Sequence, residues 1–238
     1  MNGLINLVGS GEYLPVMRDV DQYLLDSLNL NGRKARVACL PTAAGREGDS
    51  SVNRWLSMGV KHFTDLGAEV TPVRIIDRRT ADDAHWEPIL ENADLIYFSG
   101  GDPGYLFETL NESCAWRAAR RAWNHGAIYA GCSAGAMILG TRIPGFRIGM
   151  QEGFGLVPAT YIVPHFDAIP GIWKPIVFGL QRQLKKGERM LGIDEDTALI
   201  GKLGGEWIVK GKSKVHIFTP NEKTSYAAGE RLMLEESK

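Results

Sequence analysis

Short apolar segments alternate with helical patterns along the first 139 residues, and this alternation limits the fold more than any other feature of the sequence. The strand-like segments cover residues 4–8, 36–40, 70–76, 94–98 and 127–130. Between them, apolar residues recur at three- and four-residue steps, as on one face of a helix. Such alternation is typical of a parallel sheet covered by helices on both faces. We therefore predict an α/β fold with a three-layer, doubly wound, mostly parallel sheet.

The last third of the chain has a different pattern. Residues 141–160 are rich in glycine and are expected to be irregular, whereas residues 173–186 fit a helix. Strand-like segments at 161–163, 190–193, 197–202, 206–210 and 214–218 follow, and the last three are joined by short turns. Short turns favour antiparallel hairpins, which we expect to finish one edge of the sheet. Because no low-complexity linker or internal repeat interrupts the chain, we predict a single domain over residues 1–238.

Composition excludes several classes of function. The net charge of the 238 residues is -1, with no basic stripe interleaved with aromatics, which argues against a nucleic-acid or anionic-membrane surface. The N-terminus lacks a basic lead, and no apolar run is long enough to span a bilayer, so we expect a cytoplasmic protein. Cys39, Cys114 and Cys132 are far apart and suggest neither a disulfide framework nor a zinc site. We expect no cofactor and no metal.

A nucleophile elbow is indicated where the fifth strand-like segment ends. Gly131-Cys132-Ser133-Ala134-Gly135 stands between that segment and the helix-compatible residues 136–139. In a G-x-S-x-G turn, small neighbours allow a strained backbone that exposes the serine at the end of a strand. The alternative is an ordinary turn with a buried serine. We predict that Ser133 is the nucleophile, and that Cys132 points the opposite way into the core.

Three glycine-rich turns fall at the carboxyl edge of the predicted sheet, where ligands of such folds bind. They cover residues 9–11, 100–104 and 131–135. Backbone amides there can stabilise an oxyanion, and we expect the amides of Gly101, Asp102 and Ala134 to do so. The carboxylate of Asp102 is also expected to cap a helix that starts at Pro103.

A serine needs a base, and histidine is the usual one at neutral pH. The five histidines are His62, His85, His125, His165 and His216. His165 is preferred because it follows a strand at the edge where Ser133 should lie, whereas His62 is expected at the surface of a helix. Glu152 lies between serine and histidine in chain order, as the acid does in many hydrolases built on an elbow, and it is our choice for the acid. Four other carboxylates compete with it: Asp167, Asp194, Glu195 and Asp196.

Four segments in order resemble the cyanophycinase and aspartyl-dipeptidase (peptidase E-like) family of serine peptidases. They are IYFSGGDPGYLFETL, GCSAGAMILG, GFGLVPATYIVPHFD and LGIDEDTALI. The resemblance implies a class I glutamine amidotransferase-like (flavodoxin-like) fold, Ser133 as nucleophile and His165 as base. It places the acid about fifteen to nineteen positions after the serine, where Glu152 is the only carboxylate.

The resemblance ends around the histidine. Cyanophycinases share an aspartate and a glutamine before it and several arginines after it; here Val163 and Pro164 precede it and residues 168–174 contain no arginine. An aspartyl substrate would need a cation, for which Arg142, Arg147 and Lys174 are candidates. We predict a serine peptidase-like hydrolase that cleaves a small peptide or isopeptide. A homodimer is one assembly that we expect. The alternatives are a non-peptidase amidase or esterase, and a non-catalytic protein that keeps the elbow as a ligand cradle.

Overall fold

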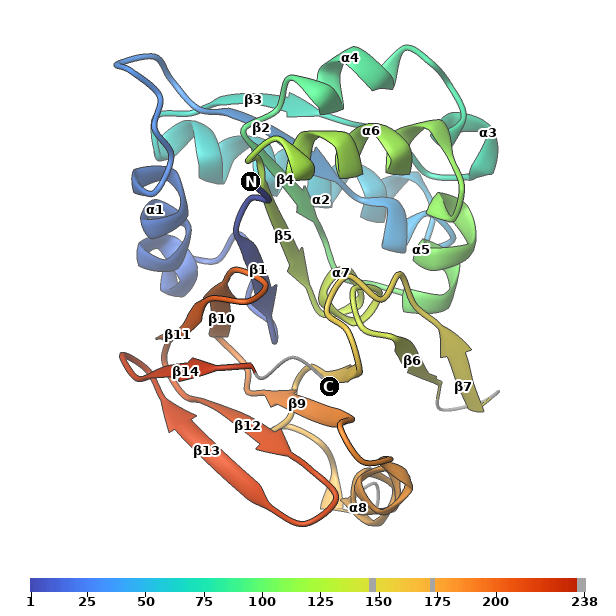
Figure 1. Ribbon diagram of the computed structural model, residues 1–238. Helices are drawn as coiled ribbons and strands as arrows, with labels where there is room; N and C mark the ends of the chain where they lie inside the picture. Colours follow the sequence, from blue (N-terminus) through green and yellow to red (C-terminus); the bar gives the residue numbers. More distant parts are fainter. Residues whose placement is uncertain (146–148, 172–173, 235–238) are drawn as a thin grey trace.

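Five parallel strands form one side of the larger of two sheets, as the alternating pattern predicts (Figure 1). The computed structural model describes residues 1–145, 149–171 and 174–234. The larger sheet contains β1 (Ile5–Val8), β2 (Arg36–Leu40), β3 (Glu69–Pro72), β4 (Leu95–Phe98), β5 (Ile128–Cys132), β10 (Thr197–Gly201), β11 (Glu206–Gly211) and β14 (Arg231–Met233). Its order is β14-β11-β10-β1-β5-β4-β2-β3. The strands from β1 to β3 in this order are parallel, whereas β10, β11 and β14 extend the sheet with antiparallel pairs.

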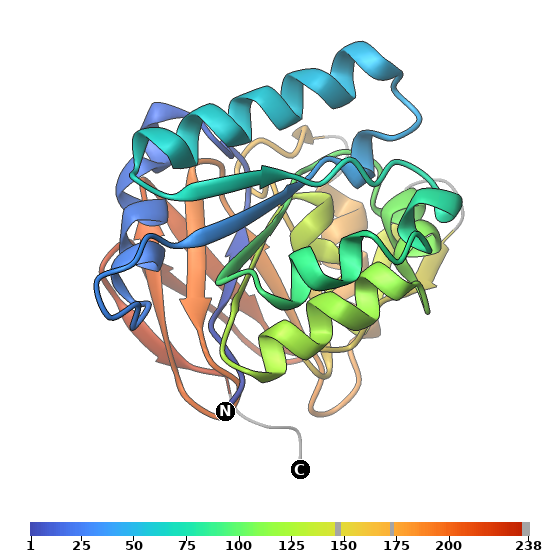
Figure 2. The same cartoon turned by 90° about the horizontal axis from the view of Figure 1, so that it is seen from above.

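Helices cover both faces of the parallel strands (Figure 2). They are α1 (Arg18–Asp26), α2 (Asp49–Asp65), α3 (Arg78–Ala81), α4 (Trp86–Glu91), α5 (Pro103–Leu110), α6 (Cys114–Asn124) and α7 (Ala134–Met137). Alternate residues of β2 show the division: Val37 and Cys39 pack with α1 and α2, whereas Ala38 and Leu40 pack with α4, α5 and α6. Strands buried on both faces read as continuous apolar runs, which explains the strand-like segments of the sequence.

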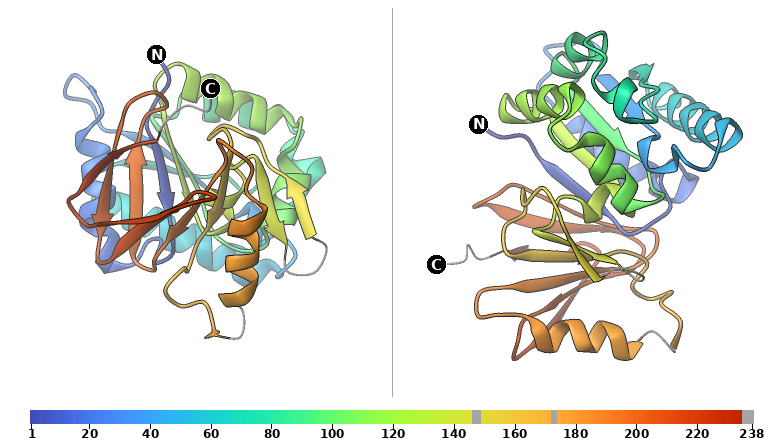
Figure 3. Two further views of the ribbon diagram at one scale, coloured as in Figure 1. Left: turned by 60° about the horizontal axis from the view of Figure 1, so that its bottom comes forward. Right: turned by 90° about the vertical axis from the view of Figure 1, so that its right-hand side faces the viewer.

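A second sheet lies beyond the carboxyl ends of the parallel strands (Figures 1 and 3). It contains β6 (Arg142–Gly145), β7 (Gly149–Glu152), β8 (Thr160–Val163), β9 (Arg189–Ile193), β12 (Lys214–Phe218) and β13 (Lys223–Ala227), in the order β13-β12-β9-β8-β6-β7. β8 is parallel to both β6 and β9, and the other pairs are antiparallel. Helix α8 (Lys174–Gln183) packs on this sheet through Leu180.

The structure confirms a mixed α/β fold with a largely parallel first sheet and corrects the account of the last third. The predicted antiparallel edge exists in β10 and β11, but β12 leaves that edge and joins the second sheet. Residues 141–160, expected to be irregular, contain the antiparallel pair β6 and β7. The amidotransferase-like wrapping and the single domain stay predictions. None of the described helices is long and apolar enough to cross a membrane.

Candidate active site

The strained elbow predicted at Ser133 is present. Ser133 follows β5 directly and precedes α7, with φ 49° and ψ -108°, a backbone conformation that non-glycine residues rarely adopt. The flanking glycines allow close approach of two backbones. A Cβ on Gly131 would lie 2.3 Å from the carbonyl oxygen of Gly135, and one on Gly135 would lie 2.3 Å from that of Phe98. Close packing around the turn therefore holds the serine in its strained conformation.

His165 and Glu195 complete a hydrogen-bonded chain with the serine. Nε2 of His165 lies 3.1 Å from Oγ of Ser133, and Nδ1 of the same ring lies 3.0 Å from Oε1 of Glu195. His165 follows β8 and Glu195 follows β9, and these two strands are parallel neighbours with Val163 opposite Gly192. Their carboxyl ends therefore meet at one edge, which places the ring and the carboxylate side by side. The pair is partly open to solvent, with side-chain exposures of 44% and 46%.

Glu152, expected to orient the histidine, does not have that position. It is exposed at the end of β7, opposite Arg142 of β6. The carboxylate within hydrogen-bond distance of Nδ1 of His165 is that of Glu195. The chain-order argument fails here because the second sheet brings β9, from later in the sequence, next to β8. The choice of Glu152 is thus not supported by the geometry.

The other three carboxylates that competed for this role have partners of their own. Asp167 accepts a hydrogen bond from the amide of Glu195 at 2.8 Å and so fixes the loop that carries the acid. Asp194 is buried and binds His216 and Ser213, and Asp196 pairs with Lys212. Among these acids, only Glu195 contacts the ring of His165.

Two of the three predicted oxyanion amides have no hydrogen-bond acceptor among the described residues. They are the amides of Gly101 and Ala134. Gly101 lines the crevice together with Ser133, and Ala134 directly follows Ser133 at the start of α7. The amide of Asp102 donates to the carbonyl of Ala43 at 3.0 Å, so the prediction that it binds the oxyanion is not supported. The carboxylate of Asp102 caps α5 by accepting from the amide of Tyr105 at 3.0 Å, as expected.

Cys132 points away from the crevice, as the alternation of side chains predicts. Its buried thiol lies 2.9 Å from Oε2 of Glu12. Burial, together with the nearby Glu12 carboxylate, raises the pKa of the Cys132 thiol well above its ordinary value. A thiol that stays protonated and inaccessible is not a nucleophile.

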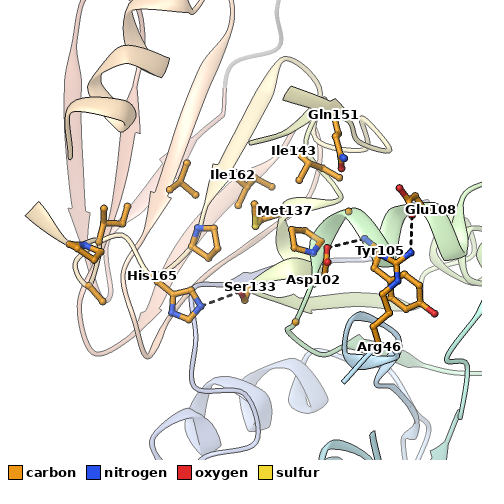
Figure 4. Close-up of a pocket in the computed structure, with 18 residues that line it drawn as sticks. Arg46, Asp102, Tyr105, Glu108, Ser133, Met137, Ile143, Gln151, Ile162 and His165 are labelled. Carbon is orange, nitrogen blue, oxygen red and sulfur yellow. Dashed lines mark hydrogen bonds and ion pairs between the residues drawn. The ribbon is translucent and has the colours of Figure 1, made fainter. Parts of the chain in front are cut away.

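A crevice of about 630 Å³ opens beside the serine (Figure 4). Ser133 and His165 lie at one end of it. The middle is largely apolar, with Met137, Ile143 and Ile162 in its wall. At the other end are Arg46, Tyr105, Glu108 and Gln151.

Arg46 and Glu108 are charged groups of the crevice that the sequence analysis did not single out. The guanidinium of Arg46 lies 4.2 Å from the centre of the Tyr105 ring and 3.7 Å from Oε2 of Glu108. Arg46 follows the turn after β2 and so lies at the carboxyl edge of the sheet. That position in the sequence could have indicated that it lines the crevice. Of the predicted cations, Arg142 is exposed and does not line the crevice. Arg147 and the side chain of Lys174 lie outside what the structure describes.

Over residues 1–145, 149–171 and 174–234, no group of three His, Cys, Asp or Glu side chains is arranged to hold a metal ion. Cys39, Cys114 and Cys132 are free thiols. His62, expected at the surface, is buried on α2 and lies 2.8 Å from Oδ2 of Asp21.

Comparison with known proteins shows which family the chain resembles. The model of peptidase family S51 matches residues 5–204. A cyanophycinase of Nostoc sp. is 28% identical over 203 residues, and one of Synechococcus elongatus is 26% identical over 210 residues. These matches cover 80% and 82% of this chain but only 65% and 63% of the cyanophycinases, so the chain spans about two thirds of their length.

Two solved structures are similar over almost the whole chain. A peptidase from an acI-B1 Actinobacterium is 36% identical, has a TM-score of 0.87, and is matched over 98% of this chain and 97% of its own. A candidate peptidase E from Listeria monocytogenes EGD-e, at 22% identity, shares the fold with a TM-score of 0.65 over 90% of this chain and 100% of its own. These findings confirm the resemblance to serine-type peptidases of the cyanophycinase and peptidase E group. The chain therefore belongs to peptidase family S51.

Proposed function

We propose that this protein hydrolyses a peptide or isopeptide amide bond in a small peptide through an acyl-enzyme intermediate. The observation that carries the proposal is the chain of hydrogen bonds from Ser133 through His165 to Glu195, at the end of a crevice. A volume of about 630 Å³ is within the range of small-ligand pockets and suits a peptide of a few residues.

Each group has a defined step in this mechanism. Oγ of Ser133 attacks the carbonyl carbon while Nε2 of His165 accepts its proton, and the same nitrogen then protonates the leaving amine. Water releases the acyl group by the reverse sequence. Glu195 accepts from Nδ1–H, which holds the ring in the tautomer that leaves Nε2 free, and its charge stabilises the imidazolium that forms. The amides of Gly101 and Ala134 bind the oxyanion.

We further propose that Arg46 meets an acidic group of the substrate. The apolar middle of the crevice is a poor place for a carboxylate, because burying an unpaired charge is costly. An aspartyl side chain or a terminal carboxylate would therefore have to extend to the polar end. Binding there would replace the long 3.7 Å pairing of Arg46 with Glu108.

The test is a substrate panel that contains aspartyl dipeptides, β-aspartyl isopeptides, neutral dipeptides and simple acyl esters. We expect amine release from peptides by the wild type, none above background with Ser133→Ala, and a higher KM for acidic peptides alone with Arg46→Gln. Hydrolysis of esters without cleavage of any peptide would instead support an amidase or esterase. Tight ligand binding by the Ser133→Ala, His165→Ala double variant, with no turnover by the wild type, would support a binding protein.

A further inference from the structure

The first glycine-rich turn, residues 9–11, and Glu12 after it supply no reacting group, yet this segment contacts the loop of the proposed triad acid. The amide of Gly9 donates to the carbonyl of Thr197 at 2.9 Å, and Oγ of Ser10 accepts from the amide of Asp196 at 3.3 Å. A Cβ on Gly9 would lie 2.1 Å from the carbonyl oxygen of Asp194. The turn is therefore packed tightly against the residues on both sides of Glu195.

Glu12, which follows this turn, links the two backbone segments that surround the nucleophile. Its Oε1 accepts from the amide of Gly100 at 2.9 Å, and its Oε2 accepts from the thiol of Cys132 at 2.9 Å. Gly100 directly precedes Gly101, and Cys132 directly precedes Ser133. The glutamate is buried, with 7% of its surface exposed, and the mechanism makes no direct use of it.

The contact with Gly100 bears on the direction of the oxyanion amide. Of three successive amides, that of Gly100 donates to Glu12 and that of Asp102 donates to Ala43, whereas that of Gly101 has no acceptor among the described residues. Hydrogen bonds to the amides on both sides hold the two Cα atoms that flank the Gly101 amide, so the main motion left to this planar peptide group is rotation about the line that joins them. Gly101 has a φ of 140°, a conformation that favours glycine. Because a glycine can adopt many other backbone conformations, the Gly101 amide can turn away when the amide of Gly100 loses its acceptor.

We infer that Glu12 is a positioning residue for the oxyanion hole. By accepting from Gly100, it keeps the amide of Gly101 aimed at the crevice, and by accepting from Cys132 it ties that amide to the elbow that carries Ser133 and Ala134. A carboxylate suits this role, because hydrogen bonds to an ionised acceptor are shorter and stronger than those to a neutral one. The inference rests on the proposed function, since it assumes acyl transfer at Ser133.

The experiment compares Glu12→Ala, Glu12→Gln and Cys132→Ser with the wild type on the best peptide of the panel. Each variant is measured for kcat, KM, and the affinity of a peptide aldehyde, whose adduct with the serine mimics the tetrahedral intermediate. Removing an oxyanion donor typically costs about 100- to 1,000-fold in kcat. Glu12→Ala leaves the Gly101 amide in place but less well oriented, so we expect a smaller loss, of about 30- to 100-fold in kcat.

The expected pattern distinguishes positioning from general stability. In Glu12→Ala, the affinity of the aldehyde should fall in parallel with kcat while KM stays within about threefold, because only the transition state uses the oxyanion hole. Glu12→Gln keeps an acceptor for Gly100 and should recover most of the activity. Cys132→Ser keeps a donor for Glu12 and should resemble the wild type.

Two outcomes overturn the inference. One is a Glu12→Ala variant with wild-type kcat and wild-type aldehyde affinity. The other is a variant that loses kcat only in proportion to its folded fraction, measured by circular dichroism at the assay temperature. If the proposed function is wrong, the result is different: the wild type itself cleaves no peptide and forms no aldehyde adduct at Ser133.

Discussion

Replacing Glu195 with glutamine separates the charge of the proposed acid from its hydrogen bond. The amide oxygen of glutamine can still accept from Nδ1–H of His165, so the tautomer of the ring is kept. What is lost is the attraction between the carboxylate and the imidazolium that forms as Ser133 gives up its proton.

The size of this attraction follows from the geometry of the pair. Nδ1 and Oε1 are 3.0 Å apart, and both side chains are nearly half exposed. Two unit charges about 4 Å apart attract by about 1 kcal/mol in bulk water and about 4 kcal/mol near a protein surface. Because solvent screens this pair, we take about 2 kcal/mol, which corresponds to a decrease of about 30-fold in kcat.

The assay is steady-state hydrolysis of the best peptide, with Glu152→Gln as the matched control. We expect a decrease of about 30-fold for Glu195→Gln and a change of less than about twofold for Glu152→Gln, which removes an exposed charge away from the ring. The reverse order of the two variants would restore Glu152 as the acid and refute the assignment of Glu195.

Three further predictions concern the oxyanion turn, the thiols and the stability of the fold. Gly101→Ala should lower kcat by at least about 100-fold in steady-state kinetics, because the added Cβ would lie 2.6 Å from the backbone of Ala43 and the amide would have to move; an unchanged kcat would contradict the assigned donor. Iodoacetamide should alkylate Cys114 before Cys132 in peptide mass maps, without loss of activity, because burial raises the pKa of the Cys132 thiol; inactivation in step with alkylation of Cys132 would contradict this. Burial lowers the pKa of His216 in the folded protein, so the unfolded chain binds more protons as the pH falls below about 6.5, and stability decreases. In urea titrations His216→Gln should lose less stability than the wild type over this range, whereas equal losses would show that His216 is not responsible.

The meeting of Ser133 and His165, our candidates for nucleophile and base, was predictable because each has a local signal. Ser133 has small residues on both sides after an apolar strand, and His165 follows a strand directly. The carboxyl ends of parallel strands gather at one edge, so two such residues far apart in the sequence are expected to meet. The structure brings them within 3.1 Å of each other.

The carboxylate that contacts His165 was not predictable from chain order, because its position depends on the second sheet. Residues 190–193 look like a strand in the sequence, but nothing local shows that, as β9, they pair in parallel with β8. Glu195 follows β9 as His165 follows β8, and that shared arrangement is a signal that could have favoured it over Glu152.

Two other differences arise from contacts between distant segments. The amide of Asp102 donates to the carbonyl of Ala43, in the turn after β2. Nothing in the sequence indicates that these two turns are in contact. His62 was expected at the surface, yet it lies three residues after Gly59, on the face that α2 buries. The burial of a histidine there requires a buried partner, Asp21, which the helical pattern alone does not reveal.

The central claim is that Ser133 is a nucleophile activated by His165, and labelling with a fluorophosphonate followed by peptide mass mapping tests it most directly. We predict a single phosphonylated peptide that contains Ser133 in the folded wild type, no label in Ser133→Ala, and labelling slowed by about 100-fold or more in His165→Ala, the usual contribution of a general base. Equal labelling of the wild type and Ser133→Ala, or a wild type that stays unlabelled while folded, would contradict the account.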